Sequence, residues 1–250
     1  MLDIITAPVL APVRHGFFGR AGGASSGVFA GLNCGYGSSD QYEAVTINRD
    51  RVAAALAVVP QALLGLHQVH SADVVIVTDP TAKRPQADAL VTALPGIALS
   101  ILTADCQPVL FADPVRRVIG VAHAGWKGAV AGVLEATVAA MVSLGSRPAD
   151  IAVAIGPSIS QRNYEVGPEF YDTVMSADAT AARFFAKGKD DRLQFDLPGY
   201  GLLRLRRAGV GQAEWTRHCT YADPARFFSY RRSVHAKEAD YGRLLAAIVL

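Results

Sequence analysis

Hydrophobic positions recur along the chain with two different periods, and the change of period predicts the order of its elements. Short apolar runs of strand length lie at 63–69, 74–77, 89–92, 97–102, 109–112 and 118–122. Since such closely spaced strands require antiparallel pairs, we expect a mixed sheet. Asp113 and Pro114 predict a turn between the last two runs, which would then form a hairpin.

Helical periodicity frames this strand-rich region. It predicts one helix that begins at Asp40 and ends near Val58, where Asp40 and Glu43 have the spacing of a capping box. The same period predicts a second helix that begins near residue 129 and stops at Gly145. The remaining elements are helices near 168–175, 179–186 and 199–208, and strands near 151–155, 213–219, 227–230 and 244–250.

This order of elements predicts an α/β or α+β layered fold with mixed sheets. The Gly- and Ser-rich stretch from Arg14 to Ser39 still contains several large apolar side chains, so it is expected to form structured loops and not a linker. We therefore expect residues 1–250 to form a single domain.

Composition excludes several classes of protein. Hydrophobic residues make up 51% of the chain and charged residues only 18%, so a sizeable core can form and disorder is disfavoured. A net charge of +2 gives no electrostatic case for binding nucleic acid or an anionic membrane. No run approaches the ~18 apolar residues of a membrane span, and the N-terminus lacks secretory features. Three widely spaced cysteines fit a reducing compartment, so a cytoplasmic enzyme is expected.

Three side chains at the ends of predicted strands are the main candidates for chemistry. Cys106 and His123 end two apolar runs, and His70 ends the run that starts at residue 63. If they converge, a His₂Cys set is typical of catalytic zinc, with three protein ligands and one open position. The alternative is a Cys106/His123 nucleophile dyad, in which Lys127 would favour the thiolate. Gln68 or Asn33 would then orient the dyad or donate a hydrogen bond to an oxyanion.

Several charged residues could assist at such a site. Acidic candidates for orienting the ligands or transferring protons are Asp73, Asp88, Asp105, Asp113 and Glu165, which the sequence does not rank. Asp105 is adjacent to Cys106, so on a regular strand it would face the opposite way. Arg49 and Lys127 suit a phosphate, although surface ion pairs explain them almost equally well. Trp126 is expected in the core or in a pocket wall.

The order of motifs along nearly the whole chain resembles the YfiH-like family. That family is also labelled multicopper polyphenol oxidoreductase, laccase-like, or peptidoglycan editing factor. The motifs that carry the resemblance are His15–Gly23, Gly31–Asn33, Asn48–Arg49, Gln68–Ser71, Ala87–Ala89, Ala104–Pro108, Ala122–Gly128, Gly156–Ile159, Tyr164–Gly167, Cys219–Tyr221, Phe227–Arg232 and Gly242–Arg243. The chain departs from the pattern at Ser158, where many members have cysteine, and in a longer segment at 233–241 that could reshape one pocket wall.

The resemblance implies a fold, a metal site and an activity. The fold is a four-layer α/β/β/α arrangement related to cytotoxic-necrotising-factor toxins, which carry a Cys/His dyad. The metal site comprises His70, Cys106 and His123 and usually holds zinc. The activity is phosphorolysis of adenosine, inosine and 5′-methylthioadenosine, with adenosine deaminase activity, so the expected partners are a small nucleoside and phosphate.

The site residues expected from the sequence and the resemblance fall into two groups. The catalytic candidates are His70, Cys106, His123 and Asp105, and the substrate-binding candidates are Asn33, Arg49, Gln68 and Lys127. The expected cofactor is Zn²⁺, and Cu²⁺ could also occupy the site because its intrinsic affinity is higher.

Three other functions stay open at this point. Six histidines are too few for the several copper centres of a multicopper oxidase, so copper-dependent polyphenol oxidation could arise only at a single site. A Cys/His amide hydrolase that edits peptidoglycan precursors is a further alternative. The last is a metal-binding module without catalytic activity.

Overall fold

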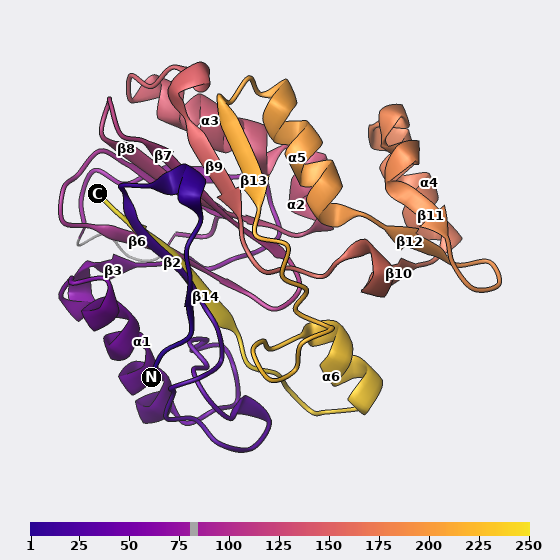
Figure 1. Ribbon diagram of the computed structural model, residues 1–250, viewed down its shortest axis with the longest axis horizontal. Coiled ribbons are helices and arrows are strands. Elements are labelled where there is room, and N and C mark those ends of the chain that lie inside the picture. Colours follow the sequence, from indigo (N-terminus) through magenta and orange to yellow (C-terminus); the bar gives the residue numbers. More distant parts are fainter. Residues whose placement is uncertain (81–84) are drawn as a thin grey trace.

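Two β-sheets pack face to face, and helices cover both of their outer faces (Figure 1). This arrangement is seen in a computed structural model, which describes residues 1–80 and 85–250. The result is a four-layer α/β/β/α sandwich with mixed sheets, as the family resemblance implied.

The larger sheet has six strands and carries the predicted hairpin. Its order is β13 (Gln212–Trp215), β9 (Ala152–Ile155), β7 (Gln107–Asp113), β8 (Val118–Ala124), β5 (Ala89–Thr92) and β4 (Val74–Ile76). The central β7 and β8 pair antiparallel, so Gln107 lies opposite Ala124. The outer pairs, β13 with β9 and β4 with β5, are parallel. The mixed character of the sheet is therefore confirmed.

The second sheet has five strands and places the C-terminal strand in its middle. Its order is β1 (Ile4–Ile5), β2 (Arg14–Phe18), β14 (Leu244–Val249), β6 (Ala98–Thr103) and β3 (Leu63–Leu64). A separate three-stranded sheet, in the order β10 (Glu165–Val166), β12 (Leu193–Phe195) and β11 (Phe185–Lys187), lies beside α4.

Residues of the central strands alternate between two buried faces. In β7, Val109 and Phe111 belong to the core under the helices, whereas Leu110 and Ala112 belong to the core between the sheets. Successive side chains of a strand point to opposite faces, so a strand buried on both sides must be apolar throughout. This explains why β7 and β8 appear in the sequence as continuous apolar runs.

Six α-helices are described, and four of them cover the sheets. Helices α2 (Trp126–Ala131), α3 (Val133–Ser143) and α5 (Leu197–Arg207) lie on the six-stranded sheet, and α1 (Tyr42–Ala55) lies on the five-stranded sheet. The other two are α4 (Pro168–Ala177) and α6 (Tyr230–Ala236). Short 3₁₀ helices are found at Pro8–Leu10, Gly27–Phe29, Pro60–Ala62, Pro148–Asp150, Gln161–Asn163 and Ala179–Phe184.

Several sequence-based boundaries were wrong for identifiable reasons. The strand predicted at 63–69 ends after Leu64, and 65–70 is a loop. The strand predicted at 227–230 does not form, because Ser229 caps α6 by accepting a hydrogen bond from the backbone N–H of Arg232. The helix predicted up to Gly145 is divided by Gly132, whose φ of 99° is left-handed. The segment 179–186 is a 3₁₀ helix followed by β11.

The capping box predicted at Asp40 and Glu43 does not form either. Helix α1 begins at Tyr42 after Gln41, which makes no side-chain cap. The Asp40 carboxylate instead accepts hydrogen bonds from the Gln41 backbone N–H and from the Asn33 amide. It therefore stabilises the preceding loop, and the helix ends at Ala55, before the expected Val58.

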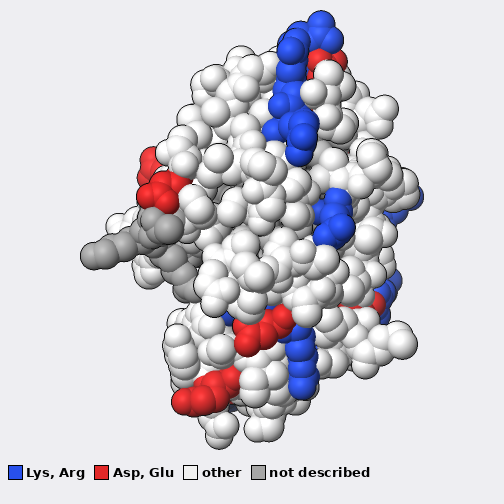
Figure 2. All heavy atoms as spheres, turned by 90° about the vertical axis from the view of Figure 1, so that its left-hand side faces the viewer, with Lys and Arg blue, Asp and Glu red and all other residues white. Residues whose placement is uncertain are grey.

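The surface turned toward the viewer in Figure 2 is largely uncharged. Its basic and acidic side chains form a few groups, and blue and red atoms adjoin each other near the top and the bottom of the view (Figure 2). Among the described residues, no helix is long and apolar enough to cross a membrane.

Candidate metal centre

The three predicted ligands come together at one edge of the sandwich. His123 lies near the end of β8, Cys106 directly precedes β7, and His70 lies on the loop after β3. The Cys106 Sγ and His70 Nε2 atoms are 3.9 Å apart, and the two imidazole rings meet edge to face with centroids 4.6 Å apart. One donor atom from each residue lies within 4.8 Å of the others.

A glycine leaves room for this cluster. Gly125 follows β8, opposite the turn that carries Cys106. A Cβ atom at Gly125 would lie only 2.8 Å from Cys106 Sγ and 3.0 Å from the His70 ring. Any larger residue would therefore push the two ligands apart.

Asp88 connects two of the three ligands. Its Oδ1 accepts a hydrogen bond of 2.7 Å from His123 Nδ1, and its Oδ2 accepts hydrogen bonds from the backbone N–H groups of Val69 and Ser71. Asp88 is fully buried. With Nδ1 occupied in this way, His123 directs Nε2 toward the cluster, which is the usual way a carboxylate orients a metal-binding histidine.

The backbone of His70 is in a conformation that its residue type disfavours. Its φ is 61°, in the left-handed region. The two N–H groups held by Asp88 belong to the residues on either side of His70, so the same carboxylate also fixes this turn. Asp88 was one of five acidic candidates in the sequence, and the structure distinguishes it from the others by these contacts.

Asp105 holds the turn that carries Cys106. Its carboxylate accepts hydrogen bonds from the hydroxyl groups of Thr220 and Ser229 and from the backbone N–H of Arg231. Asp105 also has a left-handed φ of 87°. Burial raises the pKa of Asp105, and the three hydrogen bonds oppose this effect. Asp105 thus joins the Cys106 turn to the segment that starts α6.

The cluster favours a thiolate when it holds no metal. Burial opposes ionisation of Cys106, but the charge of His123 and hydrogen bonds from both histidines lower its pKa to about 7. Burial also opposes protonation of His123, but the Cys106 thiolate and Asp88 raise the pKa of that imidazole to about 9. Cys106 and His123 therefore stabilise each other's charged forms.

The donor set fits a zinc ion. One thiolate and two imidazole nitrogens are typical zinc ligands, and three protein ligands leave a coordination position for substrate. The orientation of His123 by Asp88 supplies the further partner that such sites normally have. In the part of the chain that the structure describes, this is the one group of three or more metal-ligating side chains found close together.

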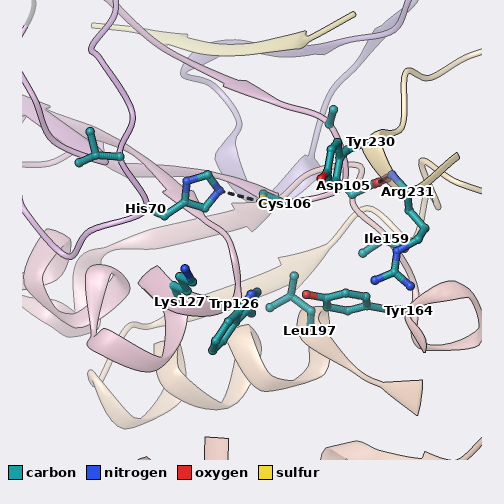
Figure 3. Close-up of a pocket in the computed structure, with 12 residues that line it drawn as sticks. His70, Asp105, Cys106, Trp126, Lys127, Ile159, Tyr164, Leu197, Tyr230 and Arg231 are labelled. Carbon is teal, nitrogen blue, oxygen red and sulfur yellow. Dashed lines mark hydrogen bonds between the residues drawn. The ribbon is translucent and has the colours of Figure 1, made fainter. Parts of the chain in front are cut away.

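Two cavities reach the cluster. The first, here called the aromatic cavity, has a volume of about 400 Å³. It is lined by Val69, His70, Ala104, Asp105, Cys106, Trp126, Lys127, Ile159, Tyr164, Leu197, Tyr230 and Arg231 (Figure 3). The second, here called the polar cavity, has a volume of about 590 Å³ and is lined by Gly35, Tyr36, Gly37, Leu66, His67, Gln68, His70, Leu102, Thr103, Ala104, Cys106, His123, Tyr230, Tyr241 and Arg243. His70 and Cys106 line both.

The four predicted substrate-binding residues are placed differently. Lys127 lines the aromatic cavity, with its ammonium group 5.8 Å from the centre of the Trp126 ring. Gln68 lines the polar cavity, and its amide pairs with both the backbone N–H and the carbonyl oxygen of Leu102. Arg49 is buried and donates to the carbonyl oxygen of Cys34, behind the polar cavity wall.

Asn33 lies among loops and lines neither cavity. It is fully buried, and its Oδ1 accepts hydrogen bonds from the backbone N–H groups of Gly35 and Arg243, both of which line the polar cavity. Asn33 would therefore affect a substrate only by holding Gly35 and Arg243 in place. The segment 233–241 reaches the polar cavity through Tyr241, in keeping with the expectation that it shapes a pocket wall.

Sequence reasoning did not single out several residues of these walls. Tyr164 and Arg231 line the aromatic cavity, with the Arg231 guanidinium 5.3 Å from the centre of the Tyr164 ring, and Arg243 lines the polar cavity. All three lie within the motifs that carried the family resemblance, but no spacing rule connects them to Cys106. Only the tertiary fold brings them together.

Comparisons with known proteins agree with this geometry. The model of a family described as multi-copper polyphenol oxidoreductase laccase matches residues 14–250. A Deinococcus radiodurans protein named purine nucleoside phosphorylase is 43% identical over 100% of this chain and 93% of its own length. The Escherichia coli purine nucleoside phosphorylase YfiH is 38% identical over 85% of this chain and 86% of its own length.

Solved structures show the same fold. A Neisseria meningitidis protein superposes with a TM-score of 0.89 at 33% identity, covering 100% of this chain and 98% of its own. YlmD from Geobacillus stearothermophilus superposes with a TM-score of 0.87 at 32% identity, covering 97% of this chain and 93% of its own.

Proposed function

The chain belongs to the multi-copper polyphenol oxidoreductase laccase family, and on that premise we propose that it is a metal-dependent purine nucleoside phosphorylase. The substrates proposed are adenosine, inosine and 5′-methylthioadenosine, together with inorganic phosphate. Relatives that match most of this chain bear the name purine nucleoside phosphorylase, which supports this choice.

One structural observation carries the proposal. The His70–Cys106–His123 cluster lies between two cavities that both reach it, so two different substrates can approach the same group of side chains. A phosphorylase has this need, because nucleoside and phosphate must meet at the ribose. Cavities of about 400 and 590 Å³ lie within the range usual for small-molecule sites.

The reaction exchanges one bond for another at the ribose. The bond between C1′ and the base nitrogen breaks, and its electron pair stays with the base. A phosphate oxygen forms the new bond to C1′, and the proton released by the phosphate completes the departing base. A zinc ion held by the cluster would supply Lewis acidity toward an electron-rich substrate atom.

The chain's own residues would bind and position the reactants. Asp88 would hold the His70 turn and orient His123. The Asp105 carboxylate is already occupied by three hydrogen bonds, so its proposed role is to position Cys106. Lys127 and Gln68 lie where they can contact substrate, while Arg49 would add positive potential from behind the polar cavity wall. We also include adenosine deamination, in which water supplies the oxygen that replaces the C6 amino group.

A product assay tests the proposal. Zinc-loaded protein is incubated with each nucleoside, with and without phosphate, and the sugar 1-phosphate, free base and inosine are quantified. With phosphate only, we expect free base together with ribose 1-phosphate from adenosine and inosine, and with 5-methylthioribose 1-phosphate from 5′-methylthioadenosine. Without phosphate, we expect inosine from adenosine. Cys106→Ser is expected to lose both reactions. A fully loaded sample that forms none of these products would refute the proposed function.

The family description keeps one further candidate in view. Copper-dependent oxidation of polyphenols is suggested by that description and by the affinity of thiolate and imidazole ligands for copper. Loading the same preparation with copper and measuring phenol oxidation beside phosphorolysis separates the two. We expect phosphorolysis with zinc, and at most slow oxidation with copper.

A further inference from the structure

We propose that the aromatic cavity binds the purine base and that phosphate enters through the polar cavity, which reaches the same cluster. This inference rests on the proposed phosphorylase function and adds the orientation of its substrates.

The aromatic cavity offers flat, apolar surfaces. Trp126 and Tyr164 lie on either side of Leu197, and Ile159 lies close to them (Figure 3). The two rings are held in place, because both contact Phe170, at centroid distances of 4.7 Å for Trp126 and 5.9 Å for Tyr164. Rings fixed before binding suit a planar base, since little side-chain entropy is lost on contact.

Two polar groups of these rings have no partner within the described part of the chain. The Tyr164 hydroxyl points toward Trp126 and Leu197, and burial raises the pKa of this phenol, so it keeps its proton (Figure 3). Neither this hydroxyl nor the Trp126 indole N–H makes a hydrogen bond to a described residue. A purine carries nitrogen atoms and a C6 substituent around its rim, which can pair with both groups.

The polar cavity suits an anion better. Its lining includes Arg243, His67 and Gln68, and none of its described lining residues is a carboxylate. The aromatic cavity has two basic side chains in its lining, Lys127 and Arg231, but it also contains the buried carboxyl group of Asp105. Arg243 uses Nη1 to contact Asp240 and the Tyr241 carbonyl oxygen. The rest of its guanidinium group is left for a phosphate.

The chemistry requires the two substrates on opposite sides. A phosphate oxygen that attacks C1′ approaches the face opposite the departing base, so base and phosphate must lie on opposite faces of the ribose. The two cavities meet at His70, Ala104, Cys106 and Tyr230, which places the ribose at that junction. Lys127 then lies on the base side, although the sequence suggested it as a phosphate ligand.

Tryptophan fluorescence tests base binding without turnover. The chain has two tryptophans, Trp126 and Trp215, and only Trp126 lines the cavity. Titrating hypoxanthine into zinc-loaded protein should quench the fluorescence of wild type and of Trp215→Phe, but not that of Trp126→Phe. Tyr164→Phe should weaken hypoxanthine binding about five- to tenfold, the effect of one lost hydrogen bond.

Kinetics on the same samples tests the phosphate side. Arg243→Gln should raise the KM for phosphate about tenfold, the effect of a lost charge-assisted hydrogen bond, and leave hypoxanthine binding unchanged. His67→Glu, at an exposed position of the polar cavity, should raise the same KM without disturbing the fold. The matched control is Tyr171→Phe, because Tyr171 packs on Phe185 and lines neither cavity. It should change neither quantity.

Two results would overturn the inference. One is hypoxanthine binding, measured by calorimetry, that is unaffected by both Trp126→Phe and Tyr164→Phe. The other is the reverse pattern, with Arg243→Gln weakening hypoxanthine binding and Tyr164→Phe raising the KM for phosphate. The proposed function would be refuted by a different measurement, the absence of ribose 1-phosphate in the product assay. If an inactive sample still showed quenching that depends on Trp126, that result would support the base subsite on its own.

Discussion

At the scale of single residues, the candidate metal centre depends most on Asp88, which is not itself a ligand. One buried carboxylate orients His123 and fixes the backbone on both sides of His70. The three ligands come from separate parts of the chain, so their convergence needs such a link. The ligand types could be predicted from the sequence, but this link could not, because it joins residues 35 positions apart through a loop.

Asp88→Asn is expected to lower zinc affinity by about 10- to 100-fold. The amide has only one oxygen, so either His123 Nδ1 or the N–H groups of Val69 and Ser71 would face an NH₂ donor. Competition with a chromogenic chelator measures the change. Ser71→Ala is the control, because it removes one hydroxyl contact to Asp88 and keeps the backbone N–H, so a small effect is expected. Equal zinc affinity in wild type and Asp88→Asn would contradict the assigned role.

Cys106 should be reactive at neutral pH in the metal-free protein. Its pKa of about 7 lies below the ordinary value of 9.0, so the reactive thiolate is already populated near pH 7. Rates of alkylation by iodoacetamide against pH, assigned by peptide mass spectrometry, should show a midpoint near pH 7. Burial raises the pKa of Cys34 to about 12, so that cysteine should stay unmodified. Bound zinc should protect Cys106, and a midpoint near 9.0 would show that His123 does not stabilise its thiolate.

At the scale of elements, the ligands lie where regular structure ends. His70 and Asp105 both have left-handed backbone conformations, and each turn is held by hydrogen bonds from a distant part of the chain. Hydrophobic periodicity predicted the strands well because burial on two faces imposes it. The strand predicted from residue 63 was too long and reached His70. Periodicity carries no signal for a turn that a remote carboxylate stabilises. Ser229 was misassigned similarly, since two preceding phenylalanines favoured a strand over a helix cap.

Removing the Asp105 carboxylate should destabilise the fold. Asp105→Ala leaves three hydrogen-bond donors without their acceptor, from Thr220, Ser229 and the Arg231 backbone. We expect a loss of ~3 kcal/mol in the free energy of unfolding, measured by urea denaturation. Asp105→Gly removes the same carboxylate but tolerates the left-handed φ of 87°, so it should lose less. Wild-type stability in Asp105→Ala would show that this carboxylate does not anchor the turn.

At the scale of the whole molecule, contact between the two sheets brings the site together. Cys106 follows a strand of the five-stranded sheet and precedes one of the six-stranded sheet, so any change in sheet spacing reaches the cluster. The layered architecture could be predicted from the order of elements and the family resemblance. The two cavities could not, since their walls combine loops and helices from most of the chain.

Gly156→Ala tests the spacing of the sheets. Gly156 follows β9 of one sheet, and an added Cβ would overlap the buried ring of Phe17 in β2 of the other. Since neither backbone nor ring has room to move, we expect a loss of about 2–3 kcal/mol, seen as a lower melting temperature in calorimetry. Gly37→Ala adds a Cβ into open space and should melt within a degree or so of wild type. Equal melting of both variants would show that the sheets separate easily.

The number of bound metal ions tests which chemistry the whole molecule can support. A multicopper oxidase needs several copper ions, whereas the described residues bring together one His₂Cys cluster. Metal analysis of protein loaded with excess zinc or copper and then desalted should give one ion per chain, and Cys106→Ser should give much less than one. Cys219→Ser is the matched control, because Cys219 lies outside the cluster and should leave the count unchanged. Three or four tightly bound coppers per chain would require ligands beyond this cluster and would favour the oxidase over the phosphorylase.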